Sequence, residues 1–224
     1  MFDKYFGFLR SHDEDSIINS LLDHSRVDLE ELIILDKMLK ILINDDTGDM
    51  TMLHDQLQQV NTENTKTFET VTDHIIQSNF DFQKQYDLLR LQQRIDSVSG
   101  LIISTSKRLL IIKNIQTEVP KPLHHKLKKI VSLTIDSQHT FIKSVERFQS
   151  SRRDVIKLIH KAEEQQHMVE NARSESLQQL FLIANEGQLR LGDCAALEGL
   201  IENFEAISES IKAATTSLDW LLLN

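Results

Sequence analysis

The stretch that decides the fold is residues 82–116, FQKQYDLLRLQQRIDSVSGLIISTSKRLLIIKNIQ. Within it, apolar side chains and one threonine recur at alternating spacings of three and four residues. This is the heptad pattern of a helix that packs against other helices along its length. The pattern predicts a long helix over 82–116 within an antiparallel bundle or coiled coil. Its seam positions are Leu88, Leu91, Ile95, Val98, Ile102, Thr105, Leu109 and Ile112.

Weaker apolar periodicity predicts five more long helices. The chain has only six glycines and two prolines, too few for the many turns that a fold of short strands needs. The expected first helix is capped by Asp13 or Asp15, and Asn64 interrupts the apolar stripe of the second. A short aromatic helix is expected before the first one, docked on the core of the protein through Phe2, Tyr5, Phe6 and Leu9. The expected long helices cover residues 14–43, 50–78, 123–149, 153–183 and 193–222.

The strongest break in the chain lies near its midpoint, at Pro120 and Pro122. Each proline removes a backbone donor and disfavours helix in the residue before it. The sequence therefore predicts an all-α fold of six long helices, arranged as two three-helix units in an elongated antiparallel bundle. The units are residues 1–118, with the N-terminal arm, and residues 119–224, and together they form a single compact domain.

Composition and charge exclude several classes of function. A net charge of −9 disfavours binding to nucleic acid. No run approaches the roughly 18 apolar residues of a membrane span, so no membrane insertion is expected. Cys194 is the only cysteine, which rules out an internal disulfide and favours a reducing compartment. Residues 121–153 are basic, and this stretch is either a solvated face or a contact for an acidic or phosphate-bearing partner.

Two helical stretches carry groups that bind metal ions in other helical bundles. Glu69 and Asp73 lie one turn apart on one helix face, and Glu163 and His167 repeat that four-residue offset in the second half. Carboxylates and imidazoles on facing helices form di-iron and di-manganese sites. A polar surface stripe explains the same spacing. The chain has no glycine-rich phosphate loop, G-x-S-x-G, CxxC or HExxH motif, and nothing in it recommends nucleophilic catalysis.

The whole pattern resembles the PhoU-like family, in its branch of stand-alone regulator-like proteins of phosphate transport. The resemblance spans nearly the full chain and includes four places where the family carries an acidic residue, three others, and a second acidic residue. One pair is intact here, and the second acid is replaced by glycine, histidine or alanine in the other three. The residues are Glu69 with Asp73, Asp96 with Gly100, Glu163 with His167, and Glu202 with Ala206.

The resemblance implies a cytoplasmic, non-enzymatic protein that binds a membrane phosphate transporter of the Pit type on its cytoplasmic side. It also implies iron or zinc as the metal, held in this chain by a smaller site than the family's multinuclear cluster. Two other functions stay open, namely a carboxylate-bridged di-metal enzyme and a metal-free helical interaction protein. The long apolar seams also allow a homo-oligomer. The implied metal ligands are Glu69, Asp73, Asp96, Glu163, His167 and Glu202.

Overall fold

The computed structural model describes residues 3–44 and 48–223, with side chains over 13–44 and 48–222. Six long helices account for nearly all of this part of the chain, which contains no strand. The all-α prediction is therefore confirmed. The helices are α1 (Asp3–Asn44), α2 (Met50–Gln77), α3 (Phe82–Asn114), α4 (Lys121–Arg147), α5 (Arg152–Asn185) and α6 (Leu191–Leu223).

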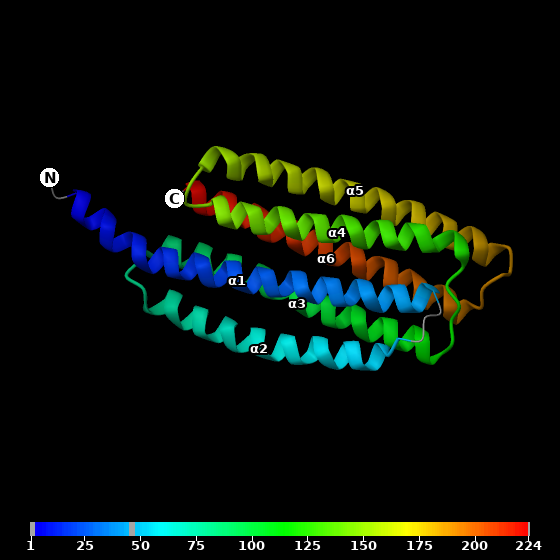
Figure 1. Cartoon of the computed structure of the whole chain (residues 1–224). Helices are drawn as coiled ribbons and strands as arrows, with labels where there is room; N and C mark the ends of the chain where they lie inside the picture. The colour runs from blue at the N-terminus through cyan, green and yellow to red at the C-terminus, as the bar shows by residue number, and fades with distance from the viewer. Residues whose placement is uncertain (1–2, 45–47, 224) are drawn as a thin grey trace.

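The helices form an elongated antiparallel bundle, in which α1, α2 and α3 pack on one another and α4, α5 and α6 do the same (Figure 1). Two long contacts join these sets, since α3 lies along α6 and α1 lies along α4. Helix α2 touches only α1 and α3, and α5 touches only α4 and α6, within the described residues. The four helices α1, α3, α4 and α6 thus surround the central core, while α2 and α5 cover its two sides.

The heptad seam of α3 lies in this core, as its spacing predicts. All eight of its positions are buried, including Thr105, whose hydroxyl donates to the Leu101 carbonyl at 2.7 Å. Phe141 of α4 and Phe204 of α6 are the largest fully buried side chains. At roughly 25 cal/mol per Å² of apolar area removed from water, burial of this kind is the main stabilising term of the fold.

The helix ends follow local sequence signals in most places. The carboxylate of Asp49 caps α2 by accepting from the amides of Thr51 (2.9 Å) and Met52 (3.2 Å). Pro120 occupies the cap position of α4, and Pro122 lies in its first turn, where a missing N–H costs nothing. The midpoint break is therefore where the prolines predicted it.

The beginning of α1 differs from the prediction. The described helix already begins at Asp3, so Asp13 and Asp15 lie inside it and neither caps its start. The aromatic arm is the first part of α1 and no separate helix. Its predicted docking on the core concerns Phe2, Tyr5, Phe6 and Leu9, which lie outside the described side chains. None of the described helices combines the length and apolar character that a membrane span requires.

Candidate functional site

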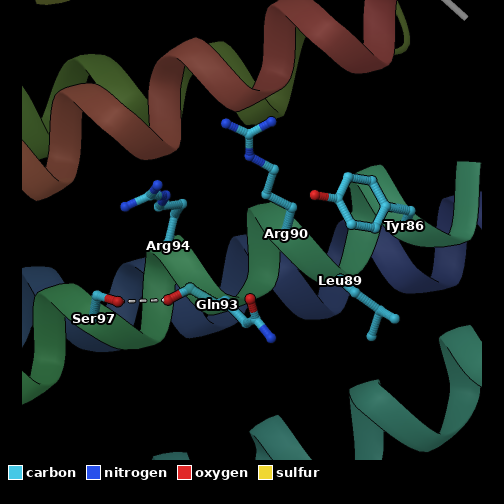
Figure 2. Close-up of a pocket in the computed structure, with 6 residues that line it drawn as sticks. All are labelled: Tyr86, Leu89, Arg90, Gln93, Arg94 and Ser97. Atoms are coloured by element: carbon cyan, nitrogen blue, oxygen red, sulfur yellow. Dashed lines mark hydrogen bonds between the residues drawn. The ribbon is translucent and has the colours of Figure 1, made fainter. Parts of the chain in front are cut away.

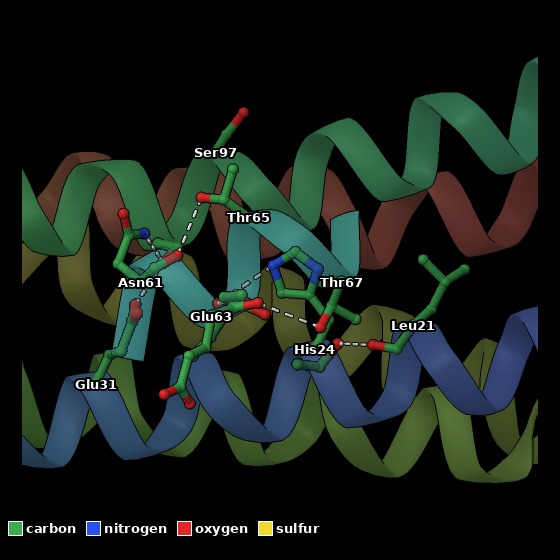
Figure 3. Close-up of polar contacts among 12 residues, drawn as sticks. Leu21, His24, Glu31, Asn61, Glu63, Thr65, Thr67 and Ser97 are labelled. Carbon is green, nitrogen blue, oxygen red and sulfur yellow. Dashed lines mark hydrogen bonds and ion pairs between the residues drawn. The ribbon is translucent and has the colours of Figure 1, made fainter. Parts of the chain in front are cut away.

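Two places in the molecule collect polar groups that the packing of the helices does not require. One is a surface cavity on α3, lined by the arginines Arg90 and Arg94 (Figure 2). The other is a cluster of ionisable side chains buried between α1, α2 and α3 (Figure 3). The buried cluster is the more unusual, because ionisable groups are rarely placed in a core unless they are paired.

The buried cluster is built on one face of α1. His24, Asp28 and Glu31 follow one another at spacings of four and three residues, so their side chains point the same way. All three are almost completely buried, with Asp28 and Glu31 at 0% exposure and His24 at 2%. Figure 3 shows His24 and Glu31 leaving α1 toward the neighbouring helices, with Asn61 of α2 above Glu31.

Hydrogen bonds connect this face of α1 to the other two helices. The hydroxyl of Ser99 on α3 donates to Glu31 Oε2 at 2.6 Å. The amide of Asn61 on α2 donates to the same hydroxyl at 2.7 Å. Asn64 interrupts the apolar stripe of α2, as the sequence indicates, and its Nδ2 lies 3.5 Å from Asp28 Oδ1. Each helix of this unit therefore contributes to one polar network.

Several atoms of the cluster still have no hydrogen-bond partner among the described residues. They are both ring nitrogens of His24, Asp28 Oδ2 and Glu31 Oε1. His24 Nε2 lies 3.9 Å from Asp28 Oδ1, which is too long for a hydrogen bond. An unsatisfied buried polar group costs roughly 1–3 kcal/mol, so the cluster lowers the stability of the fold.

Burial shifts the protonation of all three groups on α1. Desolvation lowers the pKa of His24 to about 4. Desolvation, together with the negative charges of Glu31 and Asp96, raises the pKa of Asp28 well above its usual value. The pKa of Glu31 rises to about 7, mainly through desolvation. Near neutral pH the cluster thus holds a neutral imidazole and a glutamic acid that gains or loses a proton, while burial disfavours the charged form of Asp28.

The sequence reasoning missed His24, Asp28 and Glu31. The signal that could have found them is the position of Asp28 and Glu31 on α1, where they fall at core-facing spacings beside buried Leu32 and Leu35. Only Asp96, among the predicted metal ligands, lies near enough to influence this cluster. Its carboxylate is half-buried on α3, and desolvation raises its pKa.

The other predicted ligands of the first half lie apart from the buried network. Glu69 and Asp73 are both exposed, on the side of α2 that faces solvent. Gly100, which stands where the family carries a second acid after Asp96, is also exposed, and a Cβ built there meets no atom within 4 Å. A lost side chain therefore explains this glycine, and close helix packing does not.

In the second half, the predicted ligands are engaged with neighbouring side chains. His160 Nδ1 lies 3.2 Å from Glu163 Oε2, and His167 pairs with Glu170 at 3.4 Å. Glu202 accepts two hydrogen bonds from Arg173 of α5, at 2.9 and 2.6 Å. This bidentate ion pair occupies the facing side of α5 and α6.

These placements do not bring the six predicted ligands together as a multinuclear metal cluster. In residues 13–44 and 48–222, no three histidine, cysteine, aspartate or glutamate side chains are grouped so that they could hold one ion. Arg173, bound to Glu202, places a positive charge at the α5–α6 face. The second acid of this pair is missing, because Ala206 stands in its place. Metal binding by a smaller subset of the six residues stays a prediction.

The fold was compared with known proteins. Neither a protein-family model nor a curated protein sequence matches the chain. Two solved structures from Shewanella oneidensis MR-1 match it closely in three dimensions. One is a PhoU-like protein, with a TM-score of 0.81 and 16% sequence identity, and the match covers 92% of this chain and 99% of that one.

The second structure is assigned as a PhoU-like phosphate regulatory protein, with a TM-score of 0.77, 17% identity and the same coverage of both chains. At such low identity the match shows that the helices are arranged alike, but it shows nothing about individual side chains. All six helices are included in the match. The fold of this chain is therefore that of PhoU-like proteins, as the sequence resemblance predicted.

Proposed function

We propose that this protein is a regulatory or accessory protein of inorganic phosphate transport. It acts by binding a membrane phosphate transporter of the Pit type on its cytoplasmic side, and it performs no catalysis. The observation that carries the proposal is the match, over 92% of this chain, to the fold of a protein assigned as a PhoU-like phosphate regulatory protein. The proposal needs a surface for the transporter and does not need a bound metal.

The basic stretch supplies a candidate for that surface. In its first part, the Nζ atoms of Lys126 and Lys129 lie 3.5 and 4.0 Å from the same carboxylate oxygen, Glu175 Oε2, which offsets part of their charge. Its second part lies at the turn between α4 and α5, where four exposed cations make no ion pair with any described residue. We call this surface the basic hairpin; its residues are Lys143, Arg147, Arg152 and Arg153.

The basic hairpin is complementary to an acidic cytoplasmic loop of a transporter. Charge of one sign on a protruding turn speeds association with a partner of the opposite sign, and salt weakens this effect. The rest of the chain carries an excess of acidic residues, with a total net charge of −9. We therefore expect the basic hairpin to face the transporter, because most of the remaining surface disfavours contact with a negatively charged partner.

The test is co-sedimentation of the purified protein with membrane vesicles that contain the Pit transporter of the same organism. Vesicles without the transporter are the reference. We expect retention only on the transporter vesicles, and a large loss of retention when Arg147, Arg152 and Arg153 are all replaced by glutamine. Equal retention on both kinds of vesicle would contradict the proposal, because the contact would then be with lipid.

A matched control removes the same charge elsewhere. Lys66, Lys107 and Lys113 are exposed on α2 and α3 and lie outside the basic hairpin. Their triple replacement by glutamine should leave retention nearly unchanged. If both triple variants lose retention to the same degree, net charge decides binding, and the hairpin is not the contact surface.

A further inference from the structure

Two arginines on α3 line a cavity at the surface and make no ion pair with a described carboxylate. Arg90 and Arg94 lie one turn apart and line a cavity of about 620 Å³. Figure 2 shows both guanidinium groups on the side of α3 that faces α6, with the ring of Tyr86 on the same side one turn earlier. Leu89 and Gln93 complete the wall but point away from the arginines.

Three arginines of the bundle have carboxylate partners. Arg26 pairs with Asp23 and Glu146, Arg173 with Glu202, and Arg190 with Asp193. Neither Arg90 nor Arg94 lies within 4 Å of a carboxylate in the described part of the molecule. Arg90 and Arg94 therefore place two positive charges, not offset by an ion pair, side by side at the cavity, although the chain as a whole is acidic.

Arg90 is also held in place. Its guanidinium carbon lies 4.4 Å from the centre of the Trp220 ring, near the end of α6. A cation–π contact of this kind uses the flat face of the guanidinium and leaves its N–H edge available for hydrogen bonds. Because its rotamer is fixed before any ligand arrives, less conformational entropy is lost on binding.

We propose that Arg90, Arg94 and Tyr86 form a binding site for a small molecule that carries a phosphate group. The forked N–H groups of arginine match the oxygens of a phosphate, which they can bind in a bidentate manner. The Tyr86 hydroxyl supplies one further donor. The cavity is several times larger than a phosphate ion, so it also has room for an organic group beside the aromatic ring of Tyr86, which is 52% exposed.

This proposal stands apart from the transporter proposal, because binding can be measured on the isolated protein. The assay is isothermal titration calorimetry of the full chain with inorganic phosphate, with AMP and with adenosine, at matched ionic strength. We expect AMP to bind and adenosine not to bind. Binding of inorganic phosphate with similar affinity would show that the free ion is sufficient, and AMP alone would show that the site takes an organic phosphate.

The variant test uses R94Q, since Arg94 is exposed and its replacement should not disturb folding. The loss of a charged hydrogen bond of about 1.5–3 kcal/mol predicts at least about tenfold weaker binding. R90K keeps the charge but loses the fork and the ring contact, so it should weaken binding as well. The control is K161Q, which removes an exposed cation of α5, a helix that makes no contact with α3 among the described residues, and it should bind like the unmodified protein.

The proposal is overturned if neither phosphate nor AMP binds at concentrations up to about 10 mM, where even a Kd of a few mM would be detected. It is also overturned if adenosine binds as well as AMP, or if R94Q and K161Q weaken binding equally. Thermal unfolding of each variant confirms that it is folded. Failure here leaves the transporter proposal intact, because the basic hairpin lies on α4 and α5.

Discussion

Replacing Glu31 by glutamine should make the protein more stable, and more so at high pH. Glu31 is fully buried, and its pKa is raised from 4.5 to about 7. Below pH 4.5 the side chain is protonated in both the folded and the unfolded protein. Between pH 4.5 and 7 the unfolded chain loses this proton first, so the stability of the fold decreases as pH rises through the folded-state pKa.

The size of the effect follows from the shift. One pKa unit corresponds to about 1.4 kcal/mol, so the ionisation of Glu31 costs the fold about 3 kcal/mol once the pH is well above 7. Most of this cost appears between pH 5 and pH 8. Glutamine does not ionise, and its side-chain carbonyl can still accept the hydrogen bond that the Ser99 hydroxyl donates at 2.6 Å. We therefore expect E31Q to gain about 2 to 3 kcal/mol more at pH 8 than at pH 5.

The assay is chemical denaturation of both proteins at pH 5 and pH 8, with the free energy of unfolding taken from linear extrapolation. The neighbouring Glu30 is exposed, so E30Q provides a control for the loss of one acid on the same helix. If E31Q and the unmodified protein differ by the same amount at both pH values, Glu31 ionises equally in the folded and unfolded states. The account of the buried cluster would then be wrong.

Four further predictions concern single positions. The pKa of His24 is lowered from 6.5 to about 4, so the fold loses stability as the pH falls from 6.5 toward 4. H24L should remove this loss, as measured by denaturation curves recorded across that range. Gly100 is an exposed residue in the middle of α3, with open space where a Cβ would lie. G100A should therefore raise the free energy of unfolding by about 1 kcal/mol in the same assay, and a lower free energy would show that the site is crowded. Glu69 is exposed, so E69A should change that free energy by no more than about 0.5 kcal/mol. Elemental mass spectrometry of both proteins tests the predicted metal site, which one equivalent of iron or zinc, lost in E69A, would establish. Desolvation raises the pKa of the partly buried Glu205, and the positive charge of Arg173 opposes this rise. R173Q should therefore raise the pKa of Glu205 further, as followed by NMR titration, and an unchanged value would show that the charge of Arg173 does not reach it.

Much of the fold could be predicted because helices that pack on one another show a regular spacing of apolar residues along the sequence. The seam from Leu88 to Ile112 requires a partner surface along its whole length, and all of its positions are buried. Pro120 marked the midpoint because it cannot continue a helix. The start of α1 was misjudged because Asp13 is an equally good residue for a cap or for an exposed helical position, and only the neighbouring backbone decides between them.

The candidate sites were predicted less well than the fold. The acidic pairs drew attention because of their spacing, but spacing within one helix does not determine which face is buried or what lies opposite. Glu69 is exposed, whereas Asp28, which has no comparable motif, is fully buried. Glu202 is a predicted metal ligand, and in the fold it also accepts two hydrogen bonds from Arg173, which lies 29 residues earlier in the sequence.

The sequence by itself determined the number of helices, their approximate ends and the all-α class, because these depend on interactions between residues a few positions apart. Tertiary structure alone decided where ionisable groups meet. The stack of Arg90 on Trp220 joins residues 130 positions apart, and the network of Glu31, Asn61 and Ser99 needs three helices in one register. The protonation of a buried group depends on its desolvation and on nearby charges, and both are set only when distant faces pack together.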